Sequence, residues 1–78
     1  MNTLELKEAT QEYVIYFYRP EGKGTNGEIR MNIGEKEAAV ISRSDADDSG
    51  RYAFKAAIAV MECVNRRNLP LEFTQAWV

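Results

Sequence analysis

The sequence predicts an α+β domain in which an antiparallel sheet of three to five strands packs against one long helix. Two observations predict the strands: residues 13–18 are all β-branched or aromatic, and polar and apolar residues alternate over 28–33. A third predicts the helix, because apolar residues from Tyr52 onward recur at spacings of three and four. The expected order of elements is β-β-β-α-β, with an extra N-terminal strand as a further option.

The length and composition indicate a single folded domain over residues 1–78. Separate cores arise in chains of about 250 residues or more, and this chain has 78. Its residues are 45% hydrophobic and 28% charged, which is enough apolar material to collapse and too much for a disordered tail. The formal net charge of −2 comes from scattered residues, so the composition gives no overall attraction to nucleic acid or anionic lipid.

The cysteine content and the apolar runs predict a cytoplasmic protein. Cys63 is the only cysteine and cannot form a disulfide within the chain, which favours a reducing compartment. No apolar run approaches the roughly 20 residues that cross a bilayer, and residues 1–8 lack the basic and apolar regions of a signal peptide. We therefore expect no association with membranes.

Two strands are expected in the first part of the chain. Over residues 3–9 the alternation of Leu4 and Leu6 favours a strand, although Thr3 followed by charged residues is also compatible with a short helix. Residues 13–18 form the next strand, and both of its faces are apolar. Proline and glycine follow and mark its end.

Two further strands complete a predicted antiparallel meander. Residues 23–27 contain two glycines, one of them in an Asn-Gly pair, and are expected to form a hairpin loop. The alternating segment 28–33 buries one face, and a short strand over 37–42 follows a turn. The expected core residues of these strands are Ile29, Met31, Ile33 and Ile41.

A helix and a last strand follow. Residues 44–50 are rich in Ser, Asp and Gly, which cap helices and complement the positive end of the helix dipole. Arg66 and Arg67 suit the negative end, and an Asn-Leu-Pro sequence stops the helix after about five turns. Alternation over 71–78 predicts the final strand. The helical stripe expected to face the sheet comprises Ala53, Phe54, Ala57, Ile58, Met61 and Val64.

The residue types argue against catalysis and against bound cofactors or metals. Histidine is absent, which removes the usual general base and the commonest transition-metal ligand. Asp45 begins a sequence like the first half of a calcium loop, but the twelfth position is Ala56 instead of Glu. Residues 22–25 lack the spacing of a phosphate-binding loop. We expect a non-enzymatic protein in which the aspartates cap the helix and Cys63 packs in the core.

The aromatic strand is the main candidate for binding a partner. Alternate residues of a strand point to opposite faces of the sheet. One set is expected to face the helix: Tyr13, Ile15 and Phe17. The other set is expected on the exposed face: Val14, Tyr16 and Tyr18. An alternative is that the tyrosines only cover a two-sided strand beside the terminal segments.

Cationic side chains extend this candidate site. Its predicted binding residues are Tyr16, Tyr18, Arg19, Arg30 and Lys23. Tyrosine and arginine are enriched in protein interfaces, so we expect a protein-binding or regulatory module with an unidentified protein partner. The same rings could stack bases of single-stranded nucleic acid, an alternative that the acidic charge makes less favoured. A third alternative is a structural protein that works as a homodimer through a sheet edge or the aromatic face.

Overall fold

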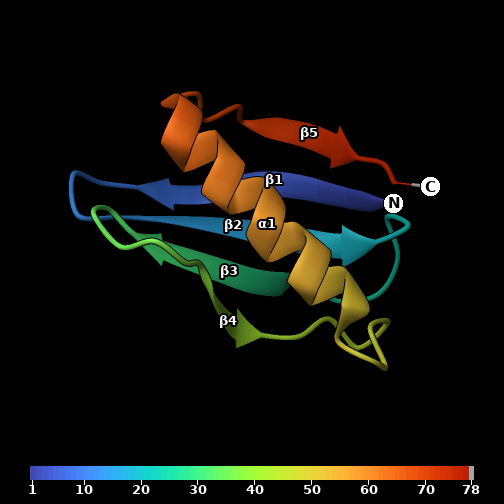
Figure 1. Cartoon of the computed structure of the whole chain (residues 1–78). Helices are drawn as coiled ribbons and strands as arrows, with labels where there is room; N and C mark the ends of the chain where they lie inside the picture. The colour runs from blue at the N-terminus through green and yellow to red at the C-terminus, as the bar shows by residue number, and fades with distance from the viewer. Residues whose placement is uncertain (78) are drawn as a thin grey trace.

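The computed structural model describes residues 1–77. Five strands form one antiparallel sheet, and one helix lies diagonally across one of its faces (Figure 1). This arrangement confirms the predicted α+β fold class. The elements are β1 (Asn2–Ala9), β2 (Tyr13–Pro20), β3 (Gly27–Asn32), β4 (Ala39–Ser42), α1 (Arg51–Arg66) and β5 (Glu72–Gln75).

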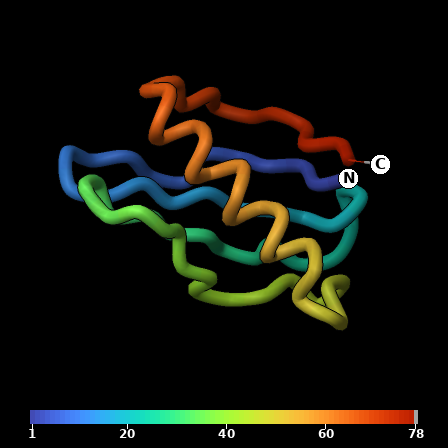
Figure 2. The backbone as a smooth tube through the Cα atoms, in the orientation of Figure 1, coloured from blue at the N-terminus to red at the C-terminus, as the bar shows by residue number. Residues whose placement is uncertain are grey.

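The strands follow the order β4-β3-β2-β1-β5 across the sheet. The first four form a meander, and β5 returns after α1 to pair with β1, so the first and last strands lie side by side (Figure 2). The strand interpretation of residues 3–9 is therefore confirmed. The predicted final strand is shorter than expected, and its last residue, Val78, lies outside the described residues.

The core is built from large rings on the sheet and small side chains on the helix. Tyr16 and Tyr18 are both 0% exposed under α1. A small helical surface lets α1 lie close to the sheet, and the two rings fill the space between the backbones. The buried helical residues are Ala53, Ala56, Ala57, Ala59 and Val60.

The predicted facing of β2 is wrong. The residues under α1 are Val14, Tyr16 and Tyr18, whereas the set on the uncovered face is Tyr13, Ile15 and Phe17. The register of β2 with β3 explains this, because opposite residues on antiparallel strands share a face of the sheet. Tyr16 lies opposite Ile29 and Val14 lies opposite Met31, and both partners belong to the buried face of β3.

Two other predicted core positions are exposed. Ile33, which is 47% exposed, follows the end of β3. Ile41 is 56% exposed because it is the extra residue of a β-bulge in β4, between Val40 and Ser42. Ile29 and Met31 are buried as predicted.

The helix begins later, and presents a different face, than predicted. Its first residue is Arg51, so residues 44–50 form a loop that precedes the helix. Phe54 was expected to face the sheet but is 64% exposed, because the alanine face described above occupies the contact. Within the described part of the chain, no helix combines the length and apolar character needed to cross a membrane.

Asp47 connects this loop to the helix and the sheet. It is 1% exposed, and its carboxylate accepts hydrogen bonds from the backbone N–H groups of Tyr52 (3.2 Å) and Ala53 (2.9 Å). The Tyr18 hydroxyl donates to the same carboxylate at 2.8 Å and accepts a bond from the Ser44 N–H at 3.1 Å. Asp47 thus caps α1 from the preceding loop, and the capping role expected for the aspartates is confirmed at this residue.

Gly27 makes room for the Tyr18 ring. The two residues lie opposite each other in the β2–β3 pair, and a Cβ atom on residue 27 would collide with the ring. Gly27 was expected in a hairpin loop, but it is the first residue of β3. Its lack of a side chain is therefore a packing requirement at this position.

We expect replacement of Tyr18 by Ala to cost about 3–5 kcal/mol of unfolding free energy, as for other large core truncations. The loss would unfold most molecules of a domain this small. Phe17→Ala is the matched control, because the neighbouring ring lies on the uncovered face and its removal should cost far less. Urea unfolding followed by circular dichroism measures both variants. Equal stability losses would contradict the assigned facing of β2.

We also expect Asp47→Ala to lower the unfolding free energy by about 2–4 kcal/mol. The variant leaves the Tyr18 hydroxyl and two helix N–H groups without their buried acceptor. Asp48→Ala removes the neighbouring, exposed carboxylate and should change stability by less than about 0.5 kcal/mol. The same urea titration compares the two, and an Asp47 variant as stable as the Asp48 variant would disprove the role of this cap.

Candidate functional site

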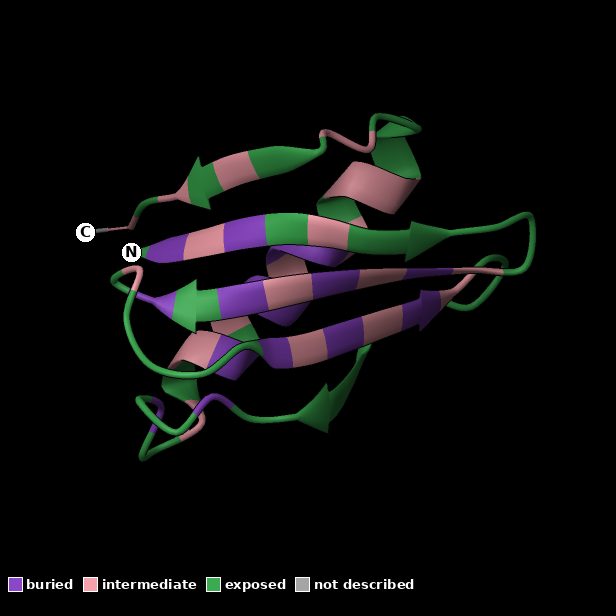
Figure 3. Ribbon diagram, turned by 180° about the vertical axis from the view of Figure 1, so that it is seen from behind, coloured by how far each residue is buried: buried purple, intermediate pink, exposed green. Residues whose placement is uncertain are grey.

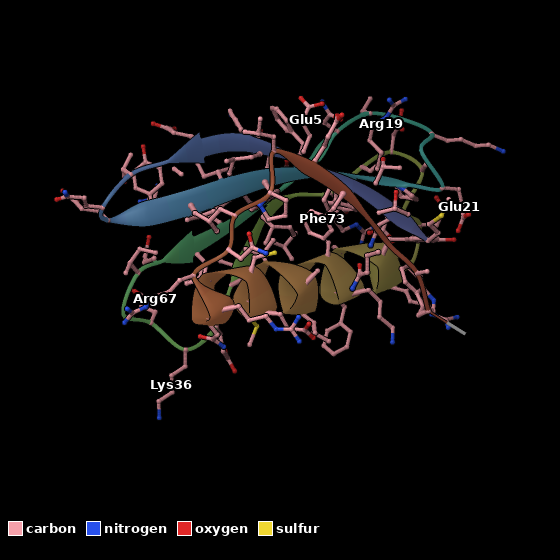
Figure 4. The ribbon with its side chains drawn as sticks, turned by 90° about the horizontal axis from the view of Figure 1, so that it is seen from above. Glu5, Arg19, Glu21, Lys36, Arg67 and Phe73 are labelled. Atoms are coloured by element: carbon pink, nitrogen blue, oxygen red, sulfur yellow. The ribbon has the colours of Figure 1, made fainter. Side chains whose placement is uncertain are left out.

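The face of the sheet opposite α1 is uncovered. In Figure 3 the strands are seen from this side with the helix behind them, and buried residues alternate with more exposed ones along β1, β2 and β3. Figure 4 shows Glu5 and Arg19 projecting away from the helix, whereas Phe73 lies between sheet and helix. We call this surface the open face. Its main side chains are Thr3, Glu5, Lys7, Tyr13, Ile15, Phe17, Arg19, Glu28, Arg30, Glu72 and Thr74.

Two of the predicted binding residues, Tyr16 and Tyr18, are not on the open face. Both are fully buried, and their hydroxyls are used inside the fold: Tyr16 donates to the Pro70 carbonyl at 2.7 Å, and Tyr18 donates to Asp47. Burial is the main reason that the pKa of each phenol is raised to about 12. The prediction that these two tyrosines are exposed anchors is therefore wrong.

The predicted cations divide between two places. Arg19 and Arg30 lie on the open face, next to the aromatic residues of β2 that were expected to face the helix. Lys23 lies in the turn after β2, where its backbone N–H donates to the Pro20 carbonyl, and its side chain is exposed. Arg30 thus lies against Tyr13 and Arg19 lies in a groove with Phe17, whereas Lys23 lies at the rim.

At one end of the open face the side chains already contact one another. The Arg30 guanidinium lies 4.1 Å from the centre of the Tyr13 ring, a cation–π contact, and its Nε donates to Asn32 Oδ1 at 3.0 Å. The Tyr13 hydroxyl donates to Glu8 Oε2 at 2.7 Å, and this hydrogen bond is the main cause of its raised pKa. These groups already have partners, so they form the border of the site.

The centre of the open face is the Phe17 ring. Lys7 lies beside it, with Nζ 5.3 Å from the ring centre, and also forms an ion pair with Glu28 at 2.7 Å. Glu5 lies opposite Phe17 on β1, and Glu28 lies opposite it on β3. Phe17 is therefore bordered by carboxylates on both neighbouring strands.

A shallow groove on the β5 side of Phe17 holds two carboxylates without partners. Glu5 and Glu72 lie directly opposite each other on β1 and β5, and among residues 1–77 neither side chain forms an ion pair or a hydrogen bond. Like charges in opposite positions destabilise a strand pair. Arg19 also lines the groove, but its Nε donates to the Gly24 carbonyl at 3.1 Å. These two carboxylates are available to accept hydrogen bonds from a cationic group.

Comparisons with family models, curated proteins and solved structures found no match. The functional interpretation consequently depends on the geometry of the chain itself. Cys63 is half-buried beside β5, and burial is the main cause of its raised pKa, which keeps the thiol protonated and weakly nucleophilic. In the described residues, no three Cys, Asp or Glu side chains come together in a way that could hold a metal ion.

Sequence reasoning did not single out Glu5, Glu72 or Phe17. Glu5 lies between Leu4 and Leu6, so its outward position follows from the alternating pattern. Its proximity to Glu72 depends on the register of two strands separated by almost the whole chain, which no local pattern reports.

We expect alkaline pH to destabilise the fold because of Tyr16 and Tyr18. Their folded pKa of about 12 exceeds the unfolded value near 10, so between these values the unfolded chain has released protons that the folded chain retains. The unfolding free energy that these tyrosines contribute below about pH 10 is therefore lost as the pH rises from about 10 to about 12. The loss is about 1.4 kcal/mol per pH unit for each tyrosine. Urea unfolding at about pH 9 and about pH 11 measures the loss, and Tyr18→Phe should reduce it. An identical pH dependence in that variant would refute the assignment.

Proposed function

We propose that the chain is a non-catalytic protein-binding module and that its open face is the binding surface. The observation that supports this most directly is the groove in which Glu5 and Glu72 face each other beside the Phe17 ring. We propose that the partner is a protein that places an arginine or lysine side chain between these two carboxylates.

The chemistry of the groove suits a cationic side chain in two ways. Two carboxylates can accept charge-assisted hydrogen bonds from one guanidinium or ammonium group. The face of the Phe17 ring attracts the same cation through its quadrupole, with arginine favoured because it also stacks on rings. Binding would also remove the repulsion between Glu5 and Glu72, so part of the affinity would come from relief of an unfavourable interaction in the unbound protein.

The charge distribution favours a protein over nucleic acid as the ligand. A row of carboxylates crosses the open face, from Glu72 through Glu5 to Glu28, with Phe17 between the last two. Binding to nucleic acid needs cations that neutralise phosphates, and such a row would repel them. Three cations also lie on this face: Lys7 contacts Glu28, Arg30 contacts Tyr13, and Arg19 donates to the Gly24 carbonyl.

The test compares a binding-face variant with a matched control. The double variant Glu5→Gln with Glu72→Gln neutralises the groove, and Glu62→Gln neutralises an exposed carboxylate on α1 whose one ion pair is a weak contact with Arg66. Each tagged protein is incubated with a nuclease-treated lysate, cross-linked, and its captured proteins are quantified by mass spectrometry. We expect a protein that Glu62→Gln retains and that the double variant captures at least about tenfold less.

A stability measurement excludes unfolding as the cause of that loss. The double variant removes a repulsive pair, so it should unfold at the same urea concentration as the wild type or at a slightly higher one. Equal capture of every protein by the two variants would rule out the groove as the binding site. A parallel capture from an untreated lysate tests the alternative, because ligands that are captured there and lost on nuclease treatment would replace the proposal with nucleic-acid binding.

A further inference from the structure

The groove beside Phe17 contains a cation as well as the carboxylates of Glu5 and Glu72. Arg19 lines the same groove, and Figure 4 shows Glu5 and Arg19 on the same side of the sheet. Glu5 and Arg19 occupy diagonal positions on paired strands, which long side chains can bridge. Among residues 1–77, however, neither forms an ion pair. The groove therefore presents positive and negative groups that do not neutralise each other.

The turn after β2 orients the Arg19 side chain. Its Nε donates to the Gly24 carbonyl at 3.1 Å, and Arg19 is exposed. In the part of the chain that the structure describes, this is the hydrogen bond that the guanidinium forms. The Nη groups of an arginine are also donors, so those of Arg19 are available to a ligand in the groove.

The polar groups of the groove form two rows across the strands. The first row consists of Glu72, Glu5 and Phe17. The second row consists of Thr74, Thr3 and Arg19. The two rows are separated by two residues along each strand, which corresponds to about 6.6–6.8 Å at the usual rise of a strand. The first row thus offers carboxylate acceptors, and the second offers hydroxyl and guanidinium donors.

Arg19 disfavours a ligand that brings only a cation. A guanidinium or ammonium group between Glu5 and Glu72 would lie in the same groove as the Arg19 guanidinium, and like charges repel. A carboxylate on the same ligand would accept charge-assisted hydrogen bonds from Arg19 and further bonds from the threonine hydroxyls of the second row. The groove is therefore complementary in charge to a ligand that carries both signs.

We infer, on the basis of the proposed function, that the groove binds an extended segment of the partner protein in which one residue separates an arginine or lysine from an aspartate or glutamate. Residues i and i+2 of an extended chain point to the same side and lie about 6.6–6.8 Å apart. This distance equals the separation of the two rows. The cation can then contact Glu5 and Glu72 while the anion contacts the second row.

Capped peptides test the pattern of charges. Ser-Arg-Ser-Asp-Ser and its reversed order, Ser-Asp-Ser-Arg-Ser, are the dipolar peptides, and Ser-Arg-Ser-Asn-Ser is the cation-only peptide. NMR titration of isotope-labelled protein, followed at the backbone amides of β1 and β5, measures their dissociation constants. We expect the better dipolar peptide to bind about three- to fivefold more tightly than the cation-only peptide. Ser-Arg-Asp-Ser-Ser places its charges on opposite sides and should bind no better than the cation-only peptide.

The variant Arg19→Gln should have opposite effects on the two kinds of peptide. It removes a partner of the anion, so the dipolar peptide should bind more weakly, and it removes a repulsion, so the cation-only peptide should bind more tightly. Lys23→Gln is the matched control, because it removes the same charge from an exposed side chain at the rim. We expect it to change the ratio of the two dissociation constants by less than about twofold. Urea unfolding should be the same for both variants and the wild type.

The outcomes separate this inference from the proposed function. Equal dissociation constants for the dipolar and cation-only peptides, both weakened by Glu5→Gln with Glu72→Gln, would overturn the dipolar pattern and leave the cation site in place. Dissociation constants that the double variant does not change would contradict the proposed function itself. The dipolar pattern would also be overturned if no peptide bound at about 10 mM, or if Arg19→Gln and Lys23→Gln had the same effect.

Discussion

The hydrogen bond between the Tyr18 hydroxyl and the Asp47 carboxylate joins the three parts of the fold. Tyr18 belongs to the central strand, Asp47 belongs to the loop before the helix, and the same carboxylate accepts the first free N–H groups of α1. The position of the helix over the sheet thus depends on one buried carboxylate that accepts three hydrogen bonds. The absence of a side chain at Gly27 is part of this arrangement, because it leaves the space that the Tyr18 ring occupies.

Local patterns predicted the elements, and long-range packing decided which of their faces are used. In β3 the alternation of polar and apolar residues indicated which face is buried, and Ile29 and Met31 are buried as expected. In β2 both faces are apolar, so only the pairing with β3 shows that Tyr16 and Tyr18 are inside. On α1 each residue is rotated by about 100° from the one before it, so Phe54 and Ala56 lie about 200° apart, on nearly opposite sides of the helix. The apolar pattern permits either side to face the sheet. The large rings of β2 select the alanine stripe, and this consequence of tertiary packing could not be found in the helical sequence alone.

In the candidate site, too, some residue positions follow from the local sequence and others depend on pairing between distant strands. The outward position of Arg30 could be predicted, because Arg30 belongs to the alternating strand β3, whereas that of Arg19 could not, because both faces of β2 are apolar. The opposition of Glu5 and Glu72 could not, because β1 and β5 meet only after the helix has crossed the sheet. The groove beside Phe17 suits a cationic side chain of another protein.

The pairing of β1 with β5 has a consequence for the order in which the protein folds. The hairpins β1–β2, β2–β3 and β3–β4 join neighbours in the sequence, and each closes a short loop. In contrast, the bond from Asn2 to Gln75 spans 73 residues, so its loop-closure entropy is the largest in the chain. The meander and helix can assemble before that bond exists, and β5 then docks on a surface that is already formed. We therefore expect the groove between Glu5 and Glu72 to form late in folding, and a nascent chain without β5 has no such groove.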